Sequence, residues 1–255
     1  MTEKDSGQQA DGPANVFLHP PDLLQFVSTE HQHFLTSLVT CHEEIKILSH
    51  VHGLYAAAMT NQTTDESTVV IFQLLAFVHY HFLFASSSYM RCHMAEGFSS
   101  ARAAIDGALI ASQIIHDRAS QVAYIERSKP FDKLIRHFKN LIRDKKPLPH
   151  PLIEHLIQQH DSCSQFASHA DVQTFAHRLE FLSKPYAMMS MGYFQFPHDP
   201  PKMKHHFLGL LHIFVVTLDI FSGFMVDEKK CLPEQWRQEL HHVGRQIEDR
   251  RKTCR

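Results

Sequence analysis

Two long apolar stretches set the main constraint on how this chain folds. The first, VVIFQLLAFVHYHFLFA, covers residues 69–85, and the second, FLGLLHIFVVTLDIFSGFMV, covers residues 207–226. The second is long enough to cross a membrane. It carries His212 and Asp219 near its middle, however, and an aspartate at that depth costs roughly 3 kcal/mol on insertion scales. We therefore predict that both stretches are buried core helices and that the protein makes no membrane contact.

The remaining sequence has helical spacing. Between Leu23 and Tyr55 apolar residues recur every three or four positions, as on one face of a helix. Only nine glycines occur in 255 residues, and no Asn-Gly or Asp-Gly pair lies between two segments of alternating hydrophobicity. We predict an all-α fold, a bundle of seven to nine helices that forms one domain over residues 16–255. Residues 1–15 are predicted to be a disordered tail, and residues 185–201 a short irregular or extended segment.

The composition is that of a globular protein. Hydrophobic residues make up 44% and charged residues 20% of the chain, which excludes a chain that is disordered throughout. The net charge of −2 provides no overall positive field, so nucleic acid would need a local patch, and we expect no DNA binding. The five cysteines are widely spaced without a C-x-x-C pair, which indicates a reducing compartment. We predict a cytoplasmic protein.

The 22 histidines raise the question of a metal site. Glu30 and His33 form an E-x-x-H pair, but a di-iron bundle needs two such pairs and two further carboxylates that all face inward. Histidines two positions apart, such as His79 and His81, point to different faces of a helix. The chain also has no H-E-x-x-H motif, no G-x-S-x-G motif and no glycine-rich phosphate loop. We predict neither a metal nor a cofactor.

One charged pair stands on a helix that is otherwise small and apolar. Arg102 and Asp106 are one helical turn apart and share a face. If that face is buried, the pair needs polar partners. The stretch CSQFASHADVQTFAHR, residues 163–178, offers hydroxyl and imidazole groups near a predicted helix end: Ser164, Ser168 and His169. The alternative is an exposed Arg102–Asp106 salt bridge and a corner histidine that is satisfied locally.

Two segments carry a resemblance to a known family. The run SSARAAIDGALIASQIIHDRASQVAYIERS and the later CSQFASHADVQTFAHR resemble uncharacterised bacterial helical families of the HEPN-like type, over roughly residues 95–225. The shared pattern is an Arg and an acidic residue on one core helix, then an aromatic residue, then Ser and His. The matching positions are Arg102, Asp106, Tyr124, Ser164 or Ser168, and His169. The spacing from Ser164 to His169 is one residue longer than in that pattern.

The resemblance implies a protein that binds RNA or a nucleotide in a defence or toxin context. It also leaves two alternatives open. The first is a HEPN-type ribonuclease that acts as a homodimer, in which an Arg and a nearby His cleave RNA. Arg237 and His242 fit that spacing on a predicted helix, with the imidazole as acid or base and the guanidinium stabilising the phosphorane. The second is a structural or protein-interaction scaffold without a ligand.

The segment KLIRHFKNLIRDKK, residues 133–146, is the strongest local anion-binding feature of the sequence. Its apolar residues follow helical spacing, so its basic residues gather on the opposite face. Four of them form the predicted anion-binding patch: Lys133, Arg136, Lys139 and Arg143. An ordinary solvated helix face produces the same pattern, so the sequence supports phosphate binding here as one of two readings.

Overall fold

The computed structural model describes residues 22–60, 62, 64–66, 68–117, 119–126, 133–167, 179–181, 189–191, 194 and 200–254. Nine α-helices lie in these ranges: α1 (Leu23–Thr40), α2 (His42–Met59), α3 (Val69–Met90), α4 (Met94–His116), α5 (Ala119–Ile125), α6 (Leu134–Arg143), α7 (Ile153–Ala167), α9 (Pro200–Gly223) and α10 (Glu234–Thr253). A π-helical turn, η2 (Phe224–Glu228), extends α9, and two short strands, β1 (Leu179–Phe181) and β2 (Met189–Met191), pair antiparallel. The predicted all-α bundle of seven to nine helices is confirmed. The predicted tail lies outside the described residues.

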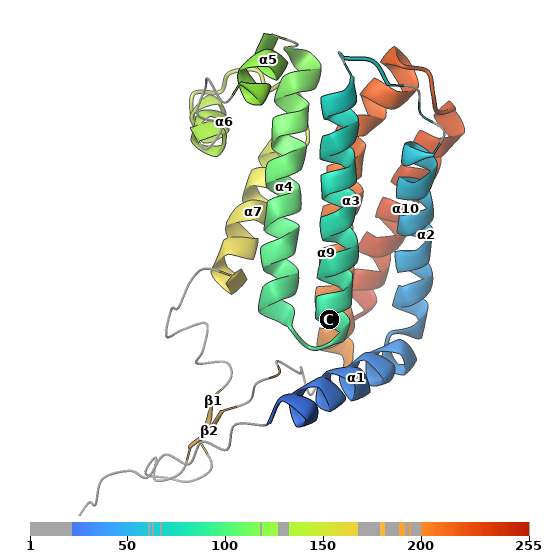
Figure 1. Cartoon of the computed structure of the whole chain (residues 1–255), viewed down its shortest axis with the longest axis vertical. Coiled ribbons are helices and arrows are strands. Elements are labelled where there is room, and N and C mark those ends of the chain that lie inside the picture. Colours follow the sequence, from blue (N-terminus) through green and yellow to red (C-terminus); the bar gives the residue numbers. More distant parts are fainter. Residues whose placement is uncertain are drawn as a thin grey trace, which may run out of the picture.

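Helices α2, α3, α4, α9 and α10 run side by side along the length of the bundle (Figure 1). Helix α1 crosses one end of the bundle, whereas α5 and α6 lie beside the opposite end of α4. Helix α7 covers the outer side of α4. Helix α9 lies behind α3 and α4 in this view and contacts α2, α3, α4, α7 and α10. Strand β2 falls within the predicted extended segment 185–201.

Helix α9 is central because it is apolar on nearly all sides, and such a helix is stable only when it is surrounded. Its buried residues include Phe207, Phe214 and Phe221, each fully covered. Both α3 and the α9–η2 segment are long and apolar enough to cross a membrane. In the bundle, 83% of the most apolar window of Pro200–Glu228 is buried, against 44% for Val69–Met90. Burial in the core therefore explains why α9 is apolar. It explains only part of the apolar character of α3, because more than half of its most apolar window is not buried.

Small residues allow α3 and α4 to approach closely. A Cβ atom at Gly107 would lie 2.9 Å from Cδ1 of Phe77, and one at Gly97 would lie 3.2 Å from the carbonyl oxygen of Ala85. Both distances are shorter than ordinary van der Waals contact. Because neither glycine has a side chain, α4 can pack closely against α3, and this contact determines which face of α4 is left for α7.

Buried polar contacts tie the C-terminal helices to the rest of the bundle. The Tyr55 hydroxyl of α2 donates a hydrogen bond of 2.8 Å to the carbonyl oxygen of Phe214 in α9. Burial raises the pKa of Tyr55, which keeps the phenol protonated as a donor. The guanidinium Nε of Arg250 lies 2.7 Å from Oε1 of Glu44, whose side chain is fully buried. These contacts join α9 and α10 to α2.

Candidate functional site

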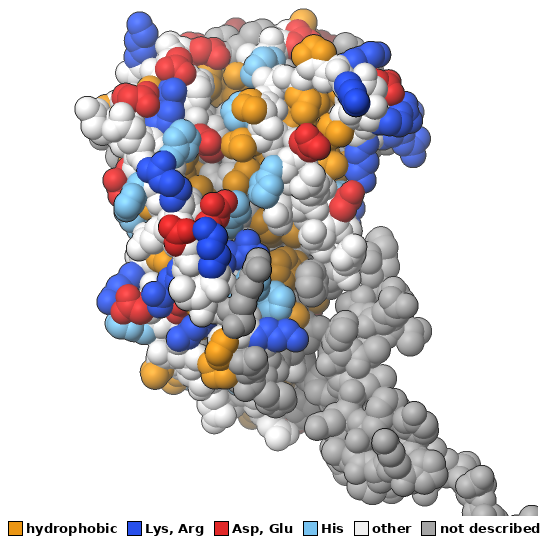
Figure 2. All heavy atoms as spheres, turned by 180° about the vertical axis from the view of Figure 1, so that it is seen from behind, with side chains coloured by type: hydrophobic (Ala, Val, Ile, Leu, Met, Phe, Trp, Pro, Cys, Tyr) orange, Lys and Arg blue, Asp and Glu red, His pale blue; other side chains and the backbone are white. Residues whose placement is uncertain are grey.

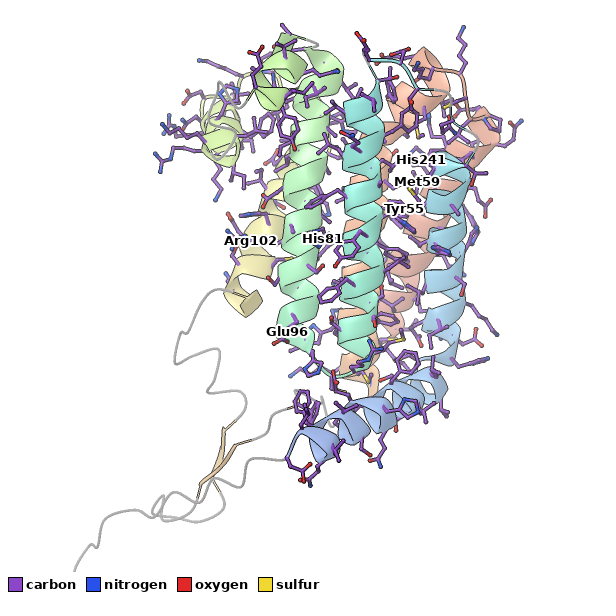
Figure 3. All side chains as sticks on the ribbon, viewed as in Figure 1. Tyr55, Met59, His81, Glu96, Arg102 and His241 are labelled. Atoms are coloured by element: carbon purple, nitrogen blue, oxygen red, sulfur yellow. The ribbon has the colours of Figure 1, made fainter. Side chains whose placement is uncertain are left out.

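The charged pair on α4 finds its partner on α7. Nε of Arg102 donates a hydrogen bond of 3.0 Å to Nε2 of His160. Nε2 of His160 also lies 3.5 Å from Oδ1 of Asp106. His160 is only 5% exposed, whereas the Asp106 side chain is 44% exposed. Arg102 lies on the side of α4 that faces α7 (Figure 3). The expectation that this pair gathers further polar groups is met by His160, a residue that the sequence reasoning did not select.

The hydrogen bond assigns a role to each side chain of the pair. A guanidinium only donates, so Nε2 of His160 is the acceptor in this bond. Burial raises the pKa of Asp106, although His160 and Arg102 oppose that shift. The cluster therefore combines a cation, an imidazole that accepts its hydrogen bond and a carboxyl group whose ionised form is disfavoured by burial.

The cluster continues outward to α6. Nδ1 of His160 lies 3.5 Å from Oδ1 of Asp161, and that oxygen accepts a hydrogen bond of 2.8 Å from Nζ of Lys139. Partial burial raises the pKa of Asp161, but the bonds from Lys139 and His160 outweigh it and leave the pKa below its usual value. Lys139 is one of the four predicted patch residues. The buried cluster and the basic face of α6 thus belong to one continuous network.

Two other residues predicted for this cluster, Ser164 and Tyr124, can be placed in the structure. The Ser164 hydroxyl donates to the carbonyl oxygen of His160 one turn earlier in α7, at 2.8 Å, and so satisfies itself within its own helix. Tyr124 lies on α5 and packs half-buried against the hydrophobic core. Ser168 and His169 lie outside the described residues. Cys163, beside Arg102, is buried, which raises the pKa of its thiol to about 12 and makes it unsuited to act as a nucleophile.

A leucine in place of His160 is expected to lower the free energy of unfolding by about 2 kcal/mol. The leucine fills a similar volume but leaves Nε of Arg102 without its hydrogen-bond acceptor. Urea denaturation of His160→Leu measures the loss. Ser164→Ala, which removes a hydrogen bond inside the same helix, is the control and should cost less than 1 kcal/mol. Equal losses in the two variants would show that the inter-helix cluster contributes nothing of its own.

The candidate ribonuclease pair does not form a shared site within one chain. Nη2 of Arg237 lies 2.7 Å from Oδ2 of Asp227, and Nη1 lies 3.6 Å from Oε2 of Glu234. The bond from Asp227 raises the pKa of Arg237. His242 is exposed on α10. Because five residues span about 500° of rotation, it points roughly 140° away from Arg237 around the helix axis. Arg237 thus forms an ion pair with Asp227 at the η2–α10 junction and does not face His242.

The four predicted patch residues are all exposed on or beside α6: Lys133, Arg136, Lys139 and Arg143. Two of them already have acidic partners, Lys139 with Asp161 and Arg143 with Asp144 at 3.0 Å. Lys145 and Lys146 follow directly and are exposed as well. Figure 2, which views the molecule from behind, shows lysine and arginine side chains gathered at the upper right, where α6 lies. We refer to Lys133, Arg136, Lys139, Arg143, Lys145 and Lys146 as the basic strip.

The histidines do not assemble a metal centre in the part of the chain that the structure describes, where no group of three or more His, Cys, Asp or Glu side chains could hold an ion. Oε1 of Glu30, from the Glu30–His33 pair, lies 2.7 Å from Nε2 of His93, just before α4. Burial lowers the pKa of His33, the other member of that pair. Glu30 therefore links α1 to the start of α4.

Comparison with known proteins returns no match: no family model, no curated protein and no solved structure is similar to this chain. The HEPN-like resemblance therefore stays a prediction from the sequence.

Proposed function

We propose that this protein binds RNA, and that the basic strip holds the phosphate backbone. The observation that carries the proposal is the exposure of the whole strip with few acidic groups beside it. Among the described residues, Lys133, Arg136, Lys145 and Lys146 have no ion-pair partner, and the strip makes ion pairs only with Asp144 and Asp161. A chain of net charge −2 thus concentrates positive charge on one short segment, as phosphate binding requires.

The dimensions of α6 favour a short single-stranded segment. The helix has ten residues and is therefore about 15 Å long. Phe138, the aromatic residue within it, is fully buried and cannot stack on a base. Binding through this strip should therefore depend on phosphate charge, vary little with sequence and weaken strongly with salt.

In this account the cluster of Arg102, Asp106 and His160 has a positioning role. It fixes α7 against α4, and the Asp161–Lys139 contact then joins α7 to α6. The basic strip is thereby supported by the bundle through polar contacts as well as through the buried Phe138. We assign no bond-breaking step to the cluster.

The proposal is tested with a triple variant that removes half of the strip. Lys133→Gln, Arg136→Gln and Lys145→Gln together are expected to weaken binding of a fluorescent single-stranded RNA about tenfold, measured by anisotropy at low salt. The matched control is Lys202→Gln, Lys230→Gln and Arg245→Gln, which are also exposed. It removes the same charges, two Lys and one Arg, and both triples include a lysine at φ 52°.

The control triple is expected to bind within twofold of the wild type, and the RNA should remain intact. Equal loss in the two triples would mean that only overall charge matters and would contradict a strip-specific site. Displacement of the RNA by a mononucleotide at similar concentration would point to a nucleotide site instead. RNA cleavage that is lost in His242→Ala would replace the proposal with the ribonuclease alternative.

A further inference from the structure

The outer face of α3 carries a stripe of large apolar side chains. Phe77 is 42% exposed, Tyr80 60%, Leu83 45% and Phe84 49%. Their spacing of three and four residues places them on one side of the helix. We call these four residues the α3 stripe. In Figure 1 α3 stands in front between α4 and α2, with α9 behind it, and no described helix covers its front.

The surroundings of the stripe are uncharged. Helix α3 contains no Lys, Arg, Asp or Glu, and neither do residues 53–60 of α2 beside it. The two histidines next to Tyr80 are hydrogen-bonded to the neighbouring helices. Nε2 of His79 lies 3.0 Å from Nδ1 of His52 in α2, and Nδ1 of His81 lies 2.7 Å from Oγ of Ser100 in α4. Burial lowers the pKa of both His79 and His81, which favours neutral rings at pH 7. An occupant of this face therefore finds no charge to pair with on α3 itself or on residues 53–60.

We propose that the α3 stripe is the interface of a homodimer in which α3 of one copy packs antiparallel on α3 of the second copy, about a two-fold axis at Tyr80. Positions 77, 80 and 83 of the stripe map onto one another under that operation. Reversing the helix about Tyr80 brings Phe77 opposite the partner's Leu83, and Ala76 opposite the partner's Phe84. A small exposed residue then faces a large one, which is how packed surfaces interdigitate.

The exposed area suits such a dimer. An aromatic side chain offers 150–250 Å², so four large side chains exposed by about half present roughly 400 Å² in each copy. Pairing two copies buries roughly 800 Å² from the stripes alone, about half of a standard interface of 1,600 Å². The neighbouring exposed surfaces of α2 and α4 lie on either side to supply the remainder. The same face lacks the Lys and Arg that would attract an anionic membrane surface.

The mass of the full-length protein in solution tests this inference. Light scattering coupled to size exclusion at micromolar concentration is expected to give the mass of a dimer. The double variant Tyr80→Glu and Phe84→Glu should raise the dimer dissociation constant on the order of a hundred-fold, because four like charges then meet in an apolar interface. The control Val39→Glu and Val122→Glu alters exposed apolar residues on α1 and α5 and should stay dimeric.

The axis itself is tested by cross-linking. In a background where the exposed Cys231 is replaced by Ser, Tyr80→Cys should form an intermolecular disulfide on mild oxidation, because residues on the axis meet their own copies. Gln246→Cys, exposed on α10, should not cross-link. A monomeric wild type would overturn the inference, as would a dimer that survives the glutamates. Flotation with vesicles that is lost in the glutamate variant would assign the stripe to a lipid surface instead.

Discussion

Replacing Arg250 with alanine should lower the free energy of unfolding by about 3 kcal/mol, measured by urea denaturation at pH 7. The guanidinium lies 2.7 Å from Oε1 of Glu44, and the Glu44 side chain is fully buried between α2 and α10. Its other oxygen, Oε2, has no hydrogen-bond partner. Removing Arg250 therefore leaves a buried carboxylate with no compensating charge, and this is a large penalty in a protein interior.

A double variant separates this cause from lost packing. Glu44→Leu together with Arg250→Met replaces the ion pair by apolar groups of similar size, and such replacements are often neutral or stabilising. We expect the double variant to lie within 1 kcal/mol of the wild type. If it is instead as unstable as Arg250→Ala, the loss comes from the shape of the contact and not from the uncompensated charge.

The second large effect is a loss of stability in acid that depends on His212. Burial, together with His155 and Arg251, lowers the pKa of His212 from 6.5 to about 4, against an opposing effect of Glu248. The unfolded chain then binds a proton that the folded chain does not, so stability is complete above pH 6.5 and falls as the pH drops toward 4. A pKa difference of this size corresponds to about 3 kcal/mol.

The measurement is the free energy of unfolding of the wild type and of His212→Gln between pH 7 and pH 4.5. The variant should lose much less stability over that range, because residue 212 no longer takes up a proton on unfolding. His242→Gln, which alters an exposed histidine, should follow the wild-type profile. Other partly buried histidines with lowered pKa, such as His79 and His155, leave a residual slope in every variant. Parallel profiles for His212→Gln and the wild type would contradict this assignment.

The helical fold was predictable because its causes are local. Helix α9 is apolar on nearly all sides from Phe207 to Phe221, roughly four turns, and a helix of that kind has to be central. Asp22, which accepts a hydrogen bond from the backbone of Gln25, caps α1 in the usual way. Neither feature depends on which helices become neighbours. Strand β1 was not anticipated, because a three-residue strand depends on its partner β2.

The candidate site was only partly predictable. The sequence singled out Arg102 and Asp106 as a charged pair that needs a partner, and the structure supplies one. That partner is His160, four residues after the buried Leu156 and three before the buried Cys163. The spacing places His160 on the apolar face of α7, and this signal was available. Which helix would bring such a face against α4 depends on tertiary packing, and no local pattern encodes it.

The central claim, that the basic strip contacts RNA phosphates, is tested most directly by the salt dependence of binding. For single-stranded nucleic acid, the logarithm of the association constant falls with the logarithm of salt concentration by about 0.7 for each phosphate neutralised. The triple variant of Lys133, Arg136 and Lys145 should therefore have a slope that is shallower than the wild type by about 2. The control triple of Lys202, Lys230 and Arg245 should keep the wild-type slope. The same slope in all three proteins would contradict the claim.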